Sequence, residues 1–222
     1  MGDLSNFVQT LSVWALPVLL AVTLHEAAHG YVAYRLGDDT AARAGRLTLN
    51  PLAHVDPFGT ILLPLMLLVF NAPFLFGYAK PVPVRIARLR NPKRDMIWVA
   101  LAGPGANIAL ALASGFLLVL AQFMPGFLSG WLFEVLQISM IFNCLIAVFN
   151  MLPIPPLDGG RVLTGLLPGP AAMKFAQIEP YGLLILIGAI FVLPMLGFSL
   201  FSHLVVTPTL ILYSLIRMLF GL

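Results

Sequence analysis

The string His25-Glu26-Ala27-Ala28-His29 has the clearest chemical pattern in the sequence. Its two histidines are four residues apart, so on a helix they lie on one face, one turn above the other. Two imidazoles in that arrangement can bind one tetrahedral zinc ion, and a glutamate beside them can act as general base for an attacking water molecule. The pattern therefore predicts one Zn²⁺ per chain, with His25 and His29 as metal ligands and Glu26 as the catalytic base.

A catalytic zinc usually has three protein ligands, so the site needs one more. The candidates are Asp158, His54, Asp56 and His203. Asp158 ends a proline-rich stretch, residues 150–158, in which a regular helix is blocked and a carboxylate can turn back toward a metal. An aspartate that caps the helix beginning near Arg161 would explain the same residue equally well. Spacing alone leaves both interpretations of Asp158 open.

The composition around these residues indicates a membrane protein. Of the 222 residues, 60% are apolar and 9% are charged, and the mean hydropathy is +0.98. A soluble domain is about a quarter charged, so this chain has too few polar groups to face water on all sides. Apolar runs near the roughly 20 residues that cross a bilayer predict membrane spans. We expect these spans at residues 7–35, 96–122, 131–151, 181–199 and 202–220.

A further apolar stretch, residues 58–76, is short for a crossing and contains Pro64. Basic residues flank it on both sides, and basic residues near span ends favour the cytoplasmic side. A re-entrant hairpin keeps both basic clusters on that side, whereas a full crossing separates them, so we favour the hairpin. Residues 76–84 should then be extended, because two prolines block a continuous helix there.

With this hairpin the remaining spans alternate, and the amino terminus is outside. The groups expected inside are the carboxyl terminus, Arg35, Arg161, Lys174 and Arg217. His25 precedes Arg35 by ten residues, which at about 1.5 Å per residue places it roughly 15 Å inside the cytoplasmic boundary. Ionisable groups at that depth are costly and are usually functional. The site is therefore expected within the bilayer, toward the cytoplasmic side of the cell membrane.

The formal net charge of +3 does not indicate a nucleic-acid partner. The basic residues cluster between the predicted spans, where they would face the cytoplasm and the anionic headgroups of the lipid bilayer. We expect one integral-membrane domain, residues 1–222. Its fold class is an all-α polytopic membrane protein of five to six transmembrane helices, with a re-entrant hairpin or short β element after the first helix. The sequence leaves the oligomeric state open.

Two motifs together resemble the site-2 protease family of intramembrane zinc metalloproteases. The signatures of that family are H-E-x-x-H and N-x-x-P-x-x-x-L-D-G. Residues 25–29 match the first and residues 150–159 match the second, in the same order and on separate hydrophobic segments. The resemblance implies that Asp158 is the third zinc ligand and that the substrates are transmembrane proteins. The sequence departs from many members of the family in showing no PDZ or CBS-like domain, so we expect a short form of the family.

Two asparagines are candidates for the substrate site. By resemblance, Asn150 lies where the family contacts the substrate peptide and helps to stabilise the oxyanion. A helix cap or an interhelical hydrogen bond would explain Asn150 as well. Asn107 ends a string of small residues that includes Gly103, and it is expected either to line the active site or to join helices. Gly103 itself is interpreted as a packing residue.

Two further features concern access to the metal. His54 is either a gate or extra ligand near the zinc, or an interfacial residue beside Asp56, and we favour the interface. Residues 77–84 are either an edge along which an unwound substrate pairs, as in β-strand addition, or a simple cytoplasmic loop.

Two other functions fit a histidine and aspartate cluster in a membrane. A transporter or channel for metal ions or protons should show paired repeats with broken helices, and the sequence shows no such repeat. A zinc-binding scaffold without catalysis would be favoured by loss of the glutamate, and Glu26 is present. Peptide-bond hydrolysis is therefore the preferred interpretation.

Overall fold

The computed structural model describes residues 2–62, 66, 79–197 and 200–222, and over these residues its regular elements are all helical. Five helical stretches in this part of the chain are long and apolar enough to cross a membrane. They are Gln9–Arg35, Pro92–Ala121, Gly130–Asn150, Gly169–Met195 and Ser202–Phe220. The structure thus confirms the predicted all-α polytopic membrane protein.

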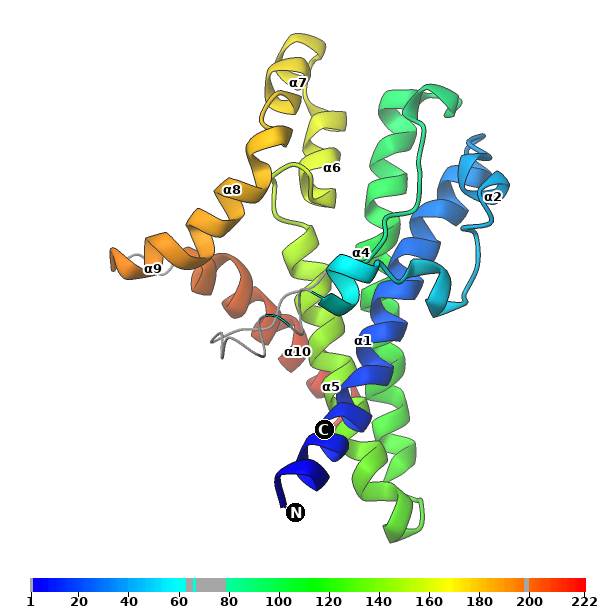
Figure 1. The fold of residues 1–222 in the computed structure, drawn as a ribbon, viewed down its shortest axis with the longest axis vertical. Coiled ribbons are helices and arrows are strands. Elements are labelled where there is room, and N and C mark those ends of the chain that lie inside the picture. Colours follow the sequence, from blue (N-terminus) through cyan, green and yellow to red (C-terminus); the bar gives the residue numbers. More distant parts are fainter. Residues whose placement is uncertain (1, 63–65, 67–78, 198–199) are drawn as a thin grey trace.

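Three long helices lie side by side at the centre of the fold (Figure 1). They are α1 (Gly2–Arg35), α4 (Pro92–Ala121) and α5 (Gly126–Asn150). Helices α1 and α4 pack around Ala33 and Val99, and α4 and α5 pack around Leu118 and Met140. Each of these helices contacts the other two, and α4 also contacts the helix that begins at Asp158, so α4 connects the two halves of the site described below.

Short elements join α1 to α4. They are α2 (Thr40–Arg43), the 3₁₀ turns η1 (Pro51–His54) and η3 (Ile86–Arg88), and the π-helical turn η2 (Pro57–Leu62). Most of the hairpin predicted over residues 58–76 lies outside the described residues. Residues 79–85 form neither helix nor strand, in agreement with the extended segment that the prolines predict.

A tight turn separates α5 from α6 (Asp158–Leu166). Its prolines end the long helix, as predicted, because proline removes a backbone donor and clashes with the preceding turn. Two glycines then pack against the backbone of the turn. A Cβ on Gly159 would lie 2.2 Å from the Met151 carbonyl oxygen, and one on Gly160 would lie 2.5 Å from the Pro155 nitrogen. These contacts require glycine and fix the start of α6, where Asp158 stands.

The C-terminal part is built of shorter helical pieces. They are α7 (Gly169–Ala176), η4 (Glu179–Tyr181), α8 (Gly182–Ile187), η5 (Gly188–Val192), α9 (Leu193–Met195), η6 (Ser202–Val206) and α10 (Thr207–Phe220). The helical run starts at Gly169, earlier than the predicted residue 181. Pro180 stands in the first turn of η4, where a proline is tolerated, so it does not interrupt the run.

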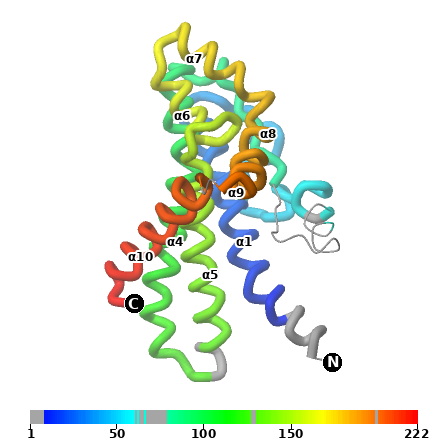
Figure 2. Tube along the Cα trace, turned by 90° about the vertical axis from the view of Figure 1, so that its left-hand side faces the viewer, coloured from blue at the N-terminus to red at the C-terminus, as the bar shows by residue number. Residues whose placement is uncertain are grey.

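Helix α10 runs in the direction opposite to the one that strict alternation predicts. Leu186 of α8 and Val205 of η6 are buried together with Leu152, so the chain returns to the carboxyl end of α5 before α10 starts. From there α10 runs toward the turn between α4 and α5, and Ile216 packs beside Leu118. The carboxyl terminus therefore lies toward the same end as that turn (Figures 1 and 2). Burial around Leu152, which the charge pattern does not reveal, sets this direction.

Candidate metal centre

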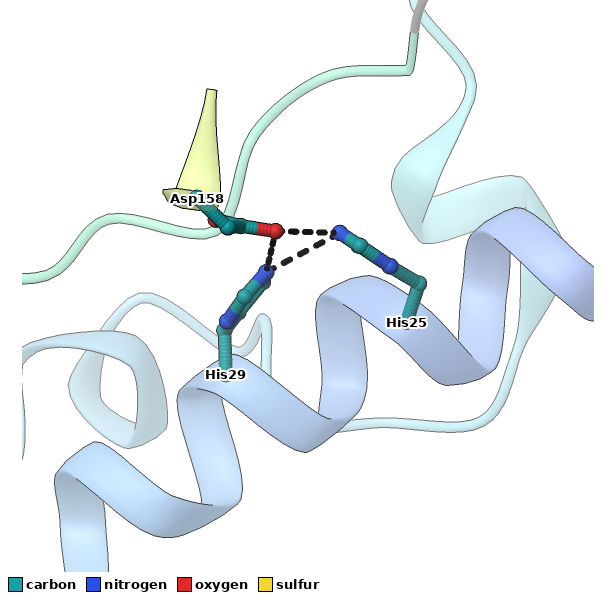
Figure 3. A group of neighbouring side chains, drawn as sticks. All are labelled: His25, His29 and Asp158. Atoms are coloured by element: carbon teal, nitrogen blue, oxygen red, sulfur yellow. Dashed lines mark hydrogen bonds and ion pairs between the residues drawn. The ribbon is translucent and has the colours of Figure 1, made fainter. Parts of the chain in front are cut away.

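The three predicted ligands come together in the structure. His25 and His29 stand one turn apart on α1, and Asp158 is the first residue of α6. Their side chains point toward one position (Figure 3). The Asp158 Oδ2 lies 3.2 Å from the His25 Nε2 and 3.3 Å from the His29 Nε2, and the two Nε2 atoms are 3.0 Å apart. All three side chains are buried.

The outward nitrogens of both imidazoles have partners on α4. The His29 Nδ1 lies 2.6 Å from the Val99 carbonyl oxygen. A carbonyl only accepts, so Nδ1–H donates to it and the lone pair of the His29 Nε2 faces inward. The His25 Nδ1 lies 2.7 Å from the Oδ1 of Asn107. Histidines that bind metals characteristically use their second nitrogen in this way, which fixes the ring and its tautomer.

These contacts suit a cation. Oδ2 of Asp158 is buried and has no hydrogen-bond donor, and inward-facing imidazole lone pairs add no donor. Buried acceptors that face one another without a partner are costly. The ligand atoms of the three residues all lie within 4.8 Å of one another. Two imidazole nitrogens and a carboxylate oxygen form a typical donor set for a catalytic zinc, so the residues fit the metal that the sequence predicts.

Helix α4 also supplies the surface on which the imidazoles pack. A Cβ on Gly103 would lie 2.4 Å from the His29 Nε2 and 2.5 Å from the His25 Cε1. The absence of a side chain at this position leaves room for both imidazole rings, whose planes are 85° apart, to point toward Asp158. Gly103 was interpreted from the sequence as a helix-packing residue, and the structure assigns it to the metal centre.

Comparison of the sequence with known proteins shows the family of this chain. The family model described as peptidase family M50 matches residues 126–194. The chain is 40% identical over 192 residues to "Putative zinc metalloprotease YwhC" of Bacillus subtilis (strain 168). This alignment covers 84% of this chain and 83% of that protein. The chain belongs to peptidase family M50.

More distant relatives of this M50 peptidase have related names. The chain is 32% identical over 186 residues to "Putative zinc metalloprotease Rip2" of Mycolicibacterium smegmatis. This alignment covers 82% of this chain and 66% of that protein. No solved structure matches the chain. The family match and these relatives confirm the resemblance to the site-2 protease family.

In the M50 peptidase, Glu26 is joined to the extended segment of residues 79–85. The Val82 N–H donates to the Oε2 of Glu26 over 2.7 Å. Further along, Arg85 N–H donates to Asp38, whose carboxylate also accepts from Thr40. Burial opposes ionisation of Asp38, but the hydrogen bonds from Thr40 and Arg85 outweigh it and hold its pKa below the usual range. Two carboxylates thus fix the segment along the carboxyl half of α1.

The other predicted residues lie around the centre in different ways. Asn107 is fully buried and contacts His25 directly. Asn150 is the last residue of α5, and its Nδ2 donates to the Ile146 carbonyl of the same helix. His54 is buried in η1, where its Nε2–H donates to the Thr48 carbonyl. His54 does not belong to the group of metal-ligand atoms found in the described residues. The predicted roles of Asn150 and His54 stay predictions.

One residue of the site was missed by sequence reasoning. Asn143 of α5 is buried, and its Oδ1 accepts a hydrogen bond of 2.8 Å from the Nδ2 of Asn107. An amide in the middle of an apolar helix is itself a signal, since polar side chains at membrane depth commonly join helices. The Val99 carbonyl that holds His29 has no such signal, because every residue carries one.

Proposed function

We propose that this M50 peptidase is a zinc metalloprotease that hydrolyses peptide bonds within transmembrane segments of other membrane proteins. The convergence of His25, His29 and Asp158 on one buried position carries the proposal. The names of the relatives and the family match support it. The ligands belong to α1 and to the start of α6, and α1 is among the helices that are long and apolar enough to span a membrane.

His25, His29 and Asp158 would hold one zinc ion. Zinc held by these residues would lower the pKa of a water molecule toward neutrality and would polarise the scissile carbonyl. Glu26 accepts the proton from the attacking water as its oxygen adds to the carbonyl carbon. Glu26 then delivers a proton to the leaving amine as the carbon–nitrogen bond breaks. The hydrogen bond from Val82 N–H orients the carboxylate through one of its oxygens.

The extended segment beside Glu26 is suited to hold the substrate. A substrate helix has its carbonyls occupied by hydrogen bonds and has to unwind before it can be cut. Residues 79–85 offer an extended backbone next to the base, which can pair with an unwound chain as in β-strand addition. Asn150 remains a candidate for the oxyanion and His54 for a gate. The hydrogens of the Asn107 amide are directed to Asn143 and Ala21, so Asn107 is the weaker candidate for the oxyanion.

The basic residues of α1, α4, α6 and α7 support an orientation with the site toward the cytoplasm, whereas Arg217, in the last turn of α10, lies toward the opposite end of the molecule. Arg35 ends α1, and Lys93 and Arg94 lie in the first turn of α4. These two helix ends lie at the same end of the molecule as α6 and α7, which carry Arg161 and Lys174 (Figure 1). Basic residues at span ends favour the cytoplasmic face of the cell membrane, which we infer is where the site opens to water.

The proposed reaction is tested by substitution of the base. The full-length protein is reconstituted in liposomes with a panel of single-span substrates, and Glu26→Gln is compared with Glu134→Gln, an exposed glutamate on α5. Loss of a general base should slow cleavage by about 10²–10⁴-fold, with zinc content unchanged, whereas Glu134→Gln should cleave like the wild type. Equal cleavage by wild type and Glu26→Gln would contradict the proposed role of Glu26.

A further inference from the structure

A chain of buried polar side chains leads from the metal centre into the apolar interior between α1, α4 and α5. His25 contacts Asn107 of α4, and Asn107 contacts Asn143 of α5. Asn107 and Asn143 are almost completely buried. Buried amides among apolar helices are costly unless every polar atom has a partner. The partners of these two amides therefore reveal what the chain fixes.

The direction of each hydrogen bond follows from backbone carbonyls, which can only accept. The Nδ2 of Asn143 lies 2.8 Å from the Ser139 carbonyl oxygen, so its amide nitrogen must face Ser139 and its Oδ1 must face Asn107. That Oδ1 accepts from the Nδ2 of Asn107 over 2.8 Å. The second hydrogen of the same Nδ2 is directed to the Ala21 carbonyl of α1, at 3.2 Å.

Both hydrogens of the Asn107 amide are thus used, and its Oδ1 is turned toward His25. The Asn107 Oδ1 can only accept, and it lies 2.7 Å from the His25 Nδ1. The His25 Nδ1 must therefore donate, so the imidazole proton lies on that nitrogen. The Nε2 then presents its lone pair to the position shared with His29 and Asp158. Without the two amides, either nitrogen of His25 could carry the proton.

We propose that Asn107 and Asn143 are positioning residues that set the tautomer of His25 and thereby the affinity of the site for zinc. The inference rests on the proposed metal site and deepens it. The same tautomer of His29 is set by the backbone carbonyl of Val99, which no side-chain substitution removes. His25 obtains it from two side chains on two helices, and its tautomer is therefore sensitive to single substitutions.

Zinc affinity of the purified full-length protein, measured by competition with a chelator, tests the role of each amide. Asn107→Leu removes the acceptor for His25 and should raise the Kd for Zn²⁺ by about 10–100-fold, the usual effect of losing a partner of a metal-binding histidine. Asn143→Leu removes one of the groups that orient Asn107 and should raise the Kd by about threefold, the effect of an average interhelical hydrogen bond in a membrane protein.

Two further variants separate positioning from packing. Asn143→Asp, as a neutral carboxylic acid, offers the same acceptor to Asn107 and the same donor to the Ser139 carbonyl, and it should restore the wild-type Kd. Ser114→Ala is the matched control. Its hydroxyl joins α4 to α5 through the Ser139 hydroxyl over 2.8 Å and contacts neither amide directly. The Ser139 hydroxyl lies 3.4 Å from the Nδ2 of Asn143, which is held by the shorter hydrogen bond of 2.8 Å to the Ser139 carbonyl. Ser114→Ala should therefore leave the zinc Kd unchanged even where it lowers stability.

The tautomer is observed directly by ¹⁵N NMR of histidine-labelled, metal-free protein. His25 should carry its proton on Nδ1 in the wild type and become a mixture of tautomers in Asn143→Leu. An unchanged zinc Kd in both leucine variants, or an Nε2–H tautomer of His25 in the wild type, would overturn the inference. So would an equal loss of affinity in Ser114→Ala. Wild type that binds zinc with the expected tautomer but cleaves no substrate contradicts only the proteolytic function, and wild type that binds no zinc overturns both proposals.

Discussion

The three-helix unit of α1, α4 and α5 and the C-terminal part from Gly169 onward are equally apolar but are packed very differently. In the most apolar stretch of α4, 39% of residues are buried within the protein, compared with 6% in the most apolar stretch of Gly169–Met195. The first region therefore uses its side chains to cover one another and the metal centre. The second leaves most of its leucines and isoleucines exposed, which suits contact with lipid.

The metal centre thus lies in the region whose side chains are buried within the protein. Asp158 is the link between the two regions, since it follows the turn that leaves α5 and precedes the C-terminal helices. Gly182 of α8 packs on that turn so closely that a Cβ would lie 1.7 Å from the Pro155 carbonyl oxygen. Through this contact the C-terminal part supports the ligand that α1 and α4 do not supply.

The largest effect is expected for the ligand that joins the regions. Asp158→Ala leaves only two imidazoles to bind the metal. Loss of a hydrogen-bond partner of a metal-binding histidine lowers zinc affinity by about 10–100-fold, and loss of the ligand Asp158 should lower it further. Metal analysis of purified protein measures this. Asp56→Ala is the control, because Asp56 was a sequence candidate for the same role and instead caps η2 through Phe58 and Gly59. Undiminished zinc in Asp158→Ala would refute its role as a ligand.

A methyl group inside the buried region should disturb the site almost as strongly. Gly103→Ala places a Cβ against both imidazoles, and overpacking of this kind costs about 1–3 kcal/mol of stability. Zinc affinity and thermal stability should fall together. Gly105→Ala, on the same helix with no heavy atom within 4 Å of its Cβ, should retain both. If the two variants bind zinc equally well, the imidazoles do not pack on α4 as described.

The contact between the regions should have an intermediate effect. Gly182→Ala forces α8 away from Pro155 and loosens the turn before Asp158, so zinc affinity should fall less than in Asp158→Ala. Gly188→Ala is the control, because Gly188 follows on the same helical run and has open space around its Cβ. Chelator competition on both variants tests whether the C-terminal part supports the site. A normal zinc Kd in Gly182→Ala would show that it does not.

The smallest effect concerns the edge of the three-helix unit, where Asp38 holds residues 79–85. Asp38→Asn should lower stability by about 1.5–3 kcal/mol, as for hydrogen bonds to a charged group. The folded-state pKa of Asp38 is lowered, so its contribution is complete above the unfolded pKa of about 3.9 and is lost as the pH falls through the folded value.

Thermal unfolding of wild type and Asp38→Asn should therefore differ near pH 7 and converge in acid below about pH 4. The control is Asp39→Asn, whose exposed ion pairs with Arg43 and Arg88 should be worth about 0–1 kcal/mol. A difference between wild type and Asp38→Asn that grows in acid would contradict the described role of the carboxylate.

Much of the fold could be predicted from the sequence because membrane spans follow from apolar length alone. The break after Asn150 was also predictable, since prolines leave the backbone few alternatives. The direction of α10 was not. It depends on the burial of Leu186 and Val205 against Leu152, which are tertiary contacts between residues far apart in the chain.

The site shows the same division. The spacing of His25 and His29 places both on one helix face whatever the rest of the chain does. Asp158 was identified by resemblance, and its approach to the imidazoles depends on glycines that pack against the preceding turn. The roles of Gly103 and Asn143 depend on which faces of α4 and α5 meet α1, and apolar sequences do not encode that clearly.

The position of the cut within a substrate tests the central claim most directly. A single-span substrate is incubated in liposomes with wild-type protein, and the products are identified by mass spectrometry. Zinc-dependent hydrolysis at a site inside the bilayer predicts a cut within the transmembrane segment that disappears with Glu26→Gln and with removal of zinc. A cut confined to the soluble flanks, or one that persists in Glu26→Gln, would contradict the proposed intramembrane protease.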